Sequence, residues 1–153
     1  VSPEIFSKGI DFIRNFADKC HHHKEEDFLF TKAVEMGLPK EGGPIGVMLY
    51  EHDLGRELVK KAAEALKKYA AGDINAAKEL AENIQQFIEL LREHIDKEDN
   101  ILYPMIECML SEKEQKFLSN AFEKVEEEEM GEGTHKKYLK LAEELEMEVE
   151  KIK

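Results

Sequence analysis

The chain has 153 residues, a length typical of one domain with a substantial core. It carries 34 acidic and 22 basic residues, and a surface with a formal net charge of -12 repels nucleic-acid backbones and anionic lipid. Hydrophobic residues make up 42% and charged residues 37%, which is typical of neither a membrane protein nor a disordered chain. We therefore expect one soluble domain over residues 1–153, with neither nucleic acid nor membrane as a partner.

Long runs rich in Ala, Glu, Lys, Leu and Ile predict helix along the whole chain, and proline is scarce at 4 residues. Ser2 followed by Pro3 is a good helix start, because Ser caps a helix and Pro suits its first turn. We expect the first helix to end at about Glu35. Residues 37–46 (GLPKEGGPIG) then form a loop.

A second helix is predicted from about residue 45 to residue 71, ending at Gly72. Asp73 is the predicted cap of a third helix, which continues to about residue 110. Pro104 lies inside this third helix and removes a backbone donor. We therefore expect a kink or a loosened turn there.

The fourth helix is predicted to begin with a capping box formed by Ser111 and Glu114. It is interrupted near Gly131, within residues 130–134 (MGEGT), and resumes from Thr134 to the C-terminus. Four long helices with mostly short connections predict an all-α, up-down four-helix bundle.

The sequence contains an internal repeat. Residues 21–30 (HHHKEEDFLF) align with residues 94–103 (HIDKEDNILY), and both follow the pattern HxxKE(E/D)xxL(F/Y). The first copy lies in the first predicted helix and the second copy in the third. Each is followed by one further histidine in the next helix, His52 and His135. The chain therefore resembles two related helix pairs, each with one HxxxE unit and one lone histidine.

Residues four apart share a helix face, so His21 with Glu25, and His94 with Glu98, form chelating pairs. At about 100° per residue, His21 is predicted to lie on the apolar face of the first helix. The same count turns His22 away from that face, and His23 likewise.

We expect four histidines and two glutamates to project into the bundle interior: His21, Glu25, His52, His94, Glu98 and His135. Burying a carboxylate in an apolar core costs several kcal/mol unless an opposite charge compensates it. A metal cation would compensate both glutamates. Imidazole and carboxylate ligands without thiolate suit iron, manganese or zinc, and carboxylates from two helices can bridge two metal ions.

The two cysteines, Cys20 and Cys108, are far apart and form neither a disulfide framework nor a CxxC motif, which indicates the cytoplasm. No apolar run approaches the roughly 18 residues of a membrane span, and no signal-peptide core is present. We therefore expect a cytoplasmic protein.

The histidine motifs resemble those of the hemerythrin-like, or HHE cation-binding, family. The resemblance implies a four-helix bundle with a carboxylate-bridged non-haem di-iron centre that binds or senses O2 or NO, or that handles iron. The segments that carry it are residues 20–26 (CHHHKEE), 51–56 (EHDLGR), 94–104 (HIDKEDNILYP) and 131–135 (GEGTH). On this match the terminal ligands would be His21, His52, His94 and His135, and the bridging ligands would be Glu25 and Glu98.

The chain departs from classical hemerythrins at one ligand. They use a second histidine one turn from the histidine of the third helix, and no histidine lies four residues before or after His94. The missing ligand could be water, Glu51, His22 or a carboxylate of residues 126–129, or the site could hold a single metal. Open positions on a metal would favour reactive chemistry, because substrates bind there.

Three functions stay open from the sequence. The leading hypothesis is a non-enzymatic protein that binds or senses O2, NO or a related small ligand through two iron ions. The alternative is a di-iron enzyme that reduces peroxide or oxygen or repairs iron–sulfur clusters. The third possibility is a structural zinc or purely helical interaction module.

Overall fold

The structure is a computed structural model that describes residues 2–131 and 133–151, except for the side chains of residues 129 and 130. The candidate carboxylate Glu129 and the motif residue Glu132 therefore have no described side chain. Helices are the only regular secondary structure in the described part of the chain, which confirms the predicted all-α class. They form four consecutive helical segments, which we call legs, and the elements of each leg are given below.

The first leg is one continuous helical rod with an unusual hydrogen-bonding pattern. Ser2 caps it by accepting a hydrogen bond from the backbone N–H of Glu4 (3.2 Å), as predicted. Sixteen residues in its middle are π-helical, with i→i+5 hydrogen bonds, which the sequence did not predict. The elements of this leg are α1 (Pro3–Phe12), η1 (Ile13–His22), η2 (Lys24–Leu29) and α2 (Phe30–Glu35).

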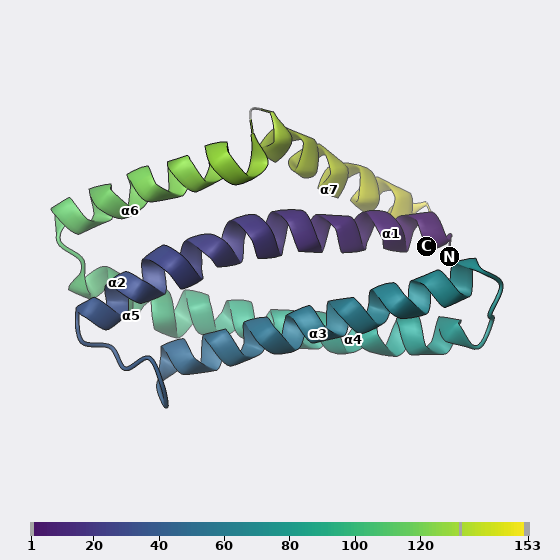
Figure 1. The fold of residues 1–153 in the computed structure, drawn as a ribbon, viewed down its shortest axis with the longest axis horizontal. Coiled ribbons are helices and arrows are strands. Elements are labelled where there is room, and N and C mark those ends of the chain that lie inside the picture. Colours follow the sequence, from purple (N-terminus) through teal and green to yellow (C-terminus); the bar gives the residue numbers. More distant parts are fainter. Residues whose placement is uncertain (1, 132, 152–153) are drawn as a thin grey trace.

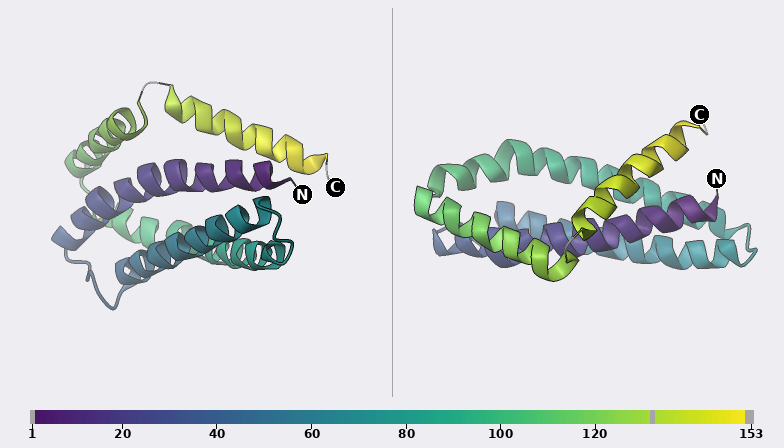
Figure 2. Two further views of the ribbon diagram at one scale, coloured as in Figure 1. Left: turned by 45° about the vertical axis from the view of Figure 1, so that its right-hand side comes forward. Right: turned by 90° about the horizontal axis from the view of Figure 1, so that it is seen from above.

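The second and third legs form an antiparallel pair that lies side by side in both views (Figures 1 and 2). Gly72 adopts a φ of 102° in the turn between them, a conformation that favours glycine. The predicted disturbance at Pro104 takes the form of a short π-helical segment just before it. The elements are α3 (Pro44–Ala70), α4 (Ala76–Lys97), η3 (Glu98–Leu102) and α5 (Tyr103–Met109).

The fourth leg is bent. It consists of α6 (Glu112–Val125), η4 (Glu126–Met130) and α7 (Thr134–Glu150), and the predicted capping box of Ser111 and Glu114 is present. Gly131 (φ 68°) and Gly133 (φ 84°) break the helix at the predicted place. Figure 1 shows α6 and α7 meeting at an angle over the first leg. From one end to the other, α6 packs on η2, η4 on η1, and α7 on α1.

Two hydrophobic clusters lie along the first three legs, and buried polar residues separate them along each leg. One cluster contains Ile10, Val59, Ala62, Ala63, Ala65, Leu66 and Leu80. The other contains Phe30, Ala33, Ile45, Met48, Leu102 and Ile106. Because burying these apolar side chains drives folding, the clusters hold the polar layer between them in place.

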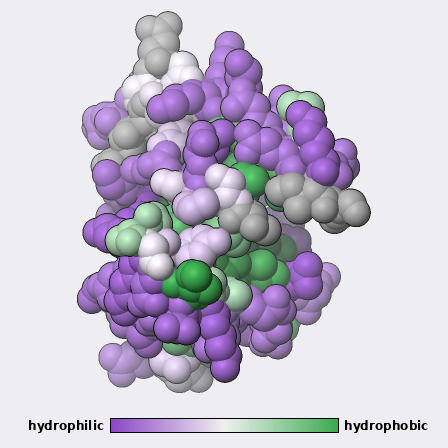
Figure 3. Space-filling view, turned by 90° about the vertical axis from the view of Figure 1, so that its right-hand side faces the viewer, coloured by the Kyte–Doolittle hydropathy of each residue, from purple (hydrophilic) through white to green (hydrophobic). Residues whose placement is uncertain are grey.

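The surface at one end of the molecule is mainly hydrophilic. Figure 3 shows this end, which carries the start of α1 and the α3–α4 turn, with a few hydrophobic residues visible near its middle. No described helix has both the length and the apolar composition needed to cross a bilayer.

Candidate metal centre

Five ionisable side chains from the first three legs are buried in the polar layer. They are Glu25 (3% exposed), Glu51 (8%), His52 (2%), His94 (4%) and Glu98 (3%). Buried ionisable groups at this density need mutual compensation or a bound cation.

The Nε2 atoms of the histidines face one another and the two glutamates. His52 Nε2 lies 3.1 Å from His94 Nε2 and 3.4 Å from a Glu25 oxygen. His94 Nε2 lies 3.0 Å from a Glu98 oxygen. The His22 ring stacks on His52, with ring centroids 3.9 Å apart and the planes 14° from parallel.

These residues form two groups with the spacing of a metal site. One group is His22, Glu25, His52 and His94, and the other is His21, Glu25 and Glu98; within each, one ligand atom per residue lies within 4.8 Å of the others. Glu25 belongs to both groups. A carboxylate shared by two ligand sets is the arrangement that can bridge two cations.

Each of the three imidazoles in the first ligand group contacts a carboxylate through its other nitrogen, Nδ1. Such a carboxylate accepts the Nδ1 proton, fixes the tautomer and leaves Nε2 free to bind a metal. The pairs are His22 with Asp18 (3.2 Å), His52 with Glu26 (2.7 Å) and His94 with Glu51 (2.9 Å).

The pKa shifts of His22 and Glu25 suit a cation-binding site, whereas that of His94 means that a cation would compete with a proton there. Burial and the neighbouring His52 lower the pKa of His22 to about 4, so this imidazole is neutral near neutral pH, as a ligand must be. Burial raises the pKa of Glu25, but the contacts with His52, His21 and Tyr103 outweigh it and bring the value to about 2. Burial lowers the pKa of His94, and the carboxylates of Glu98 and Glu51 more than offset this.

Two buried carboxylate oxygens have no hydrogen-bond partner, Glu25 Oε2 and Glu98 Oε1. Both approach an imidazole Nε2, at 3.4 and 3.0 Å, but without hydrogen-bond alignment. A buried acceptor left without a donor is costly, and these two oxygens point into the candidate ligand groups. The residues present therefore fit a bound metal cation.

The predicted orientations of His21 and His22 are wrong. The side chain of His21 is 50% exposed and that of His22 only 15% exposed, the reverse of the prediction. The prediction used the angular step of an α-helix, whereas residues 13–22 are π-helical and advance by a smaller angle per residue. Over this segment the lag amounts to about one residue, so His22 takes the inward place predicted for His21. His21 still reaches Glu25, with Nε2 3.5 Å from Oε1.

His135 lies apart from both ligand groups. It sits at the start of α7, next to the Phe16 ring at a centroid distance of 5.2 Å. It lines an open surface hollow at the bend of the fourth leg, together with Glu123, Glu126, Glu127 and Gly131. Its assignment as a ligand stays a prediction.

The other candidates for the missing ligand differ in their contacts. The Glu51 carboxylate contacts His94 Nδ1 and also pairs with Lys97. Burial raises the pKa of Glu51, but these two contacts lower it below its ordinary value. Glu126 pairs with Lys24. His22, by contrast, joins the first ligand group.

Some supporting residues were not predicted. Asp18 lies four residues before His22 on the same leg, a spacing that could have indicated the pair. Glu26 reaches His52 across two legs, and no local pattern marks such a contact. Tyr103, whose hydroxyl donates a hydrogen bond to Glu25, also acts from another leg.

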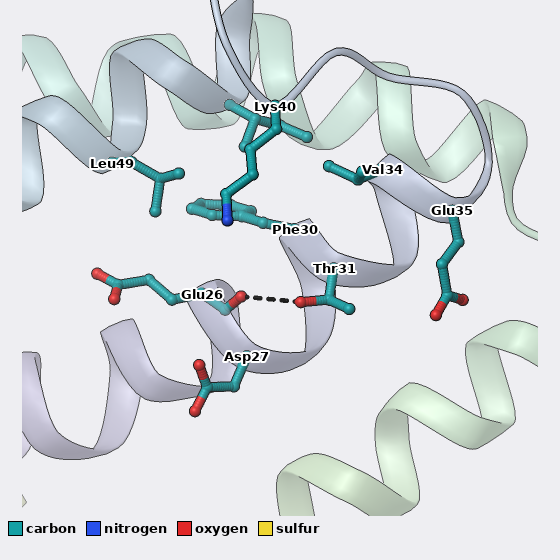
Figure 4. A pocket seen from close by; sticks show the side chains of 9 residues that line it. Glu26, Asp27, Phe30, Thr31, Val34, Glu35, Lys40 and Leu49 are labelled. Carbon is teal, nitrogen blue, oxygen red and sulfur yellow. Dashed lines mark hydrogen bonds between the residues drawn. The ribbon is translucent and has the colours of Figure 1, made fainter.

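A cavity of about 350 Å³ lies beside this layer (Figure 4). Phe30 in its wall also stacks near His52, with ring centroids 5.9 Å apart. The hydroxyl of Thr31 donates a hydrogen bond to the main-chain oxygen of Glu26 (3.2 Å), and Lys40 from the loop between α2 and α3 also lines the cavity. Residues that contact His52 thus also line a space accessible to small molecules.

Comparison with known proteins gives a family match over residues 4–106, which run from α1 into α5. The matching model is described as the hemerythrin HHE cation binding domain. No solved structure matches the chain.

Several curated proteins are similar to the chain. An uncharacterized protein of Mycobacterium bovis is 27% identical over 126 residues, which cover 82% of this chain and 49% of that protein. The iron-sulfur cluster repair protein YtfE of Yersinia pestis is 38% identical over 88 residues, which cover 55% of this chain and 39% of that protein. The chain therefore spans half or less of the length of these relatives.

Proposed function

Because the chain belongs to the hemerythrin HHE cation-binding family, we propose that it holds a non-haem di-iron centre within a hemerythrin-like four-helix bundle. The observation that carries the proposal is the position of Glu25, which belongs to both ligand groups. Imidazole and carboxylate ligands without thiolate suit iron. Iron also agrees with the name of the Yersinia relative.

The two ligand groups give the residues for each ion. His22, His52 and His94 would hold one ion, His21 and Glu98 would hold the other, and Glu25 would bridge them. Five of the six ligands predicted from the sequence lie in these groups, and His22 is added to them. The second group offers fewer protein ligands, so more positions on that ion stay open to a small ligand.

The function we propose is to bind or sense a small ligand such as O2 or NO, or to handle iron. Bound iron supplies redox chemistry and open coordination positions. The protein's own residues would keep the ligand set in place: three carboxylates orient the imidazoles, and Tyr103 holds Glu25.

Metal analysis of protein isolated from its native source, combined with anomalous scattering at the iron edge, tests the centre. We expect two iron ions per chain, with Glu25 between them. Zinc alone would support a structural zinc module instead, and one ion bound without Glu25 would contradict the bridged centre. For the small ligand, we expect the absorption spectrum of the reduced protein to change when O2 or NO is admitted.

A second candidate function is the repair of iron–sulfur clusters, favoured by the similarity to the Yersinia protein over 88 residues. The test is transfer of iron from the loaded protein to a protein that lacks its cluster, followed by recovery of the cluster spectrum. Recovery no faster than with free iron at the same concentration would contradict this function.

A further inference from the structure

Arg56 connects three carboxylates on the outer side of the ligand layer. Its Nε donates to Asp18 Oδ1 (2.8 Å), one terminal nitrogen donates to Glu26 Oε1 (2.7 Å), and the other donates to Asp53 Oδ1 (3.0 Å). The guanidinium is half-buried between the first leg and α3. Burial lowers its pKa, but Glu26 and Asp18 raise it well above the ordinary value, so it stays charged.

Two of these carboxylates use the same oxygen to contact an imidazole. Asp18 Oδ1 also contacts His22 Nδ1, and Glu26 Oε1 also contacts His52 Nδ1. One guanidinium therefore joins the outer nitrogens of two imidazoles that stack on each other and come from different legs.

Asp18 and Glu26 need this support because they are half-exposed, at 32% and 24% of their side chains. Water competes for such carboxylates and weakens their hold on a neighbouring group. The third imidazole, His94, is held differently: its partner Glu51 is buried and pairs with Lys97 instead. Arg56 thus binds the carboxylates that contact His22 and His52, but not the one that contacts His94.

We propose that Arg56 is a positioning residue that fixes the tautomer and orientation of both His22 and His52, with their Nε2 atoms turned toward the ligand group. The planar fork of arginine matches this task, because adjacent nitrogens of one plane can bind two carboxylates at once. The single ammonium of lysine has the charge but lacks this geometry. The effect on metal affinity rests on the proposed metal centre, whereas the effect on the tautomers does not.

The first test uses metal-free protein and the ¹H–¹⁵N correlations of the histidine rings. In Arg56→Gln we expect the Nδ1–H form of His22 and His52 to decrease, while the signals of His135, which lies outside both ligand groups, stay unchanged as an internal control. Wild-type ring signals for His22 and His52 in this variant would overturn the proposal.

The second test measures the affinity for Fe(II) against a competing chelator. Loss of a group that orients metal-binding histidines typically costs about 10- to 100-fold in metal affinity, and we expect a loss in this range for Arg56→Gln. Arg56→Lys should show a similar loss, and the exposed Arg92→Gln should bind like wild type. Wild-type affinity in Arg56→Lys would overturn the role of the fork.

Two further variants keep the proposal testable if Arg56→Gln does not fold. Asp18→Asn should lower the Nδ1–H form of His22 more than that of His52, and Glu26→Gln should do the reverse. A shift of neither would overturn the proposal. Failure of the wild type itself to bind Fe(II) would instead contradict the proposed metal centre, and the ring signals of the metal-free protein would still decide the role of Arg56.

Discussion

His52 on α3 and His94 on α4 face each other through Nε2 atoms that lie 3.1 Å apart, and both Nδ1 atoms contact a carboxylate on the outer side. Two unprotonated Nε2 atoms at this distance would repel. Burial lowers the pKa of His94, but the carboxylates of Glu98 and Glu51 raise it above its ordinary value, which favours the protonated imidazole when no cation is bound. A metal cation would take the place of that proton, and we therefore expect metal binding to release protons.

Glu25 gives the most direct test of a bridged centre. Glu25→Gln removes the negative charge shared by both ligand groups, so we expect the stoichiometry of Fe(II) to fall from two ions per chain to at most one. Titration with Fe(II) under anaerobic conditions measures it. Glu57→Gln, at an exposed position on α3, is the matched control. Two ions bound with wild-type affinity in Glu25→Gln would refute the bridge.

Tyr103 stabilises the Glu25 carboxylate before any metal binds. Burial and the nearby Glu25 raise the pKa of Tyr103, so its hydroxyl stays protonated and donates to Glu25. Tyr103→Phe leaves a buried carboxylate oxygen without its donor, and we expect the metal-free protein to lose about 1–3 kcal/mol of unfolding free energy. Urea denaturation measures this loss. Tyr50→Phe, at a position 67% exposed, should change little, and an equal loss in both variants would argue against a specific role of Tyr103.

The capping box of α6 predicts a pH dependence away from the metal centre. The backbone and side chain of Ser111 donate to Glu114 and lower the pKa of this carboxyl below its ordinary value of 4.5. A lowered folded-state pKa stabilises the fold above the unfolded pKa, and this contribution is lost as the pH falls through the folded-state pKa.

We therefore expect Glu114→Gln to unfold more easily than wild type at pH 7 and to approach it as the pH falls below about 4.5. Chemical denaturation of the metal-free protein across this range checks the trend, with Glu112→Gln in the same first turn as the control. A difference that stays constant with pH would show that ionised Glu114 contributes nothing.

The boundaries of the helices were predicted well because local side chains determine them. Ser2 with Pro3, and Ser111 with Glu114, satisfy free backbone donors within a few residues, and Gly131 permits a φ that other residues avoid. The π-helical segments were not predicted, because composition does not mark a change from i→i+4 to i→i+5 bonding.

The candidate site was predicted only in part, because local spacing identifies some of its residues and not others. The HxxxE motifs identified Glu25 and Glu98 as interior residues, and both are buried. The choice between His21 and His22 required the angular step of η1, which the sequence did not reveal. The carboxylates that hold His52 and His94 come from other legs, so only the tertiary structure places them.

The remaining difference between sequence and structure concerns His22 and His135. In the structure His22 lies in the first ligand group and His135 lies outside both. We therefore expect His22→Ala to weaken Fe(II) binding at least tenfold and His135→Ala to change it less than threefold, as measured by competition with a chelator. His23→Ala, beside His22 on the same leg but paired with Asp27, is the matched control.

The reverse result would have a structural meaning. If His135→Ala lost metal while His22→Ala kept it, α7 would have to swing at the glycines of residues 131 and 133 when metal binds, bringing His135 to the ligand groups. Glycine at both positions makes such a rotation inexpensive, because positive φ costs it nothing. Gly133→Ala would then weaken metal binding as well, whereas it should leave the affinity unchanged if His22 is the ligand. His22→Ala and His135→Ala therefore distinguish two cases. In one, the first three legs supply all the protein ligands; in the other, the fourth leg supplies His135 as well.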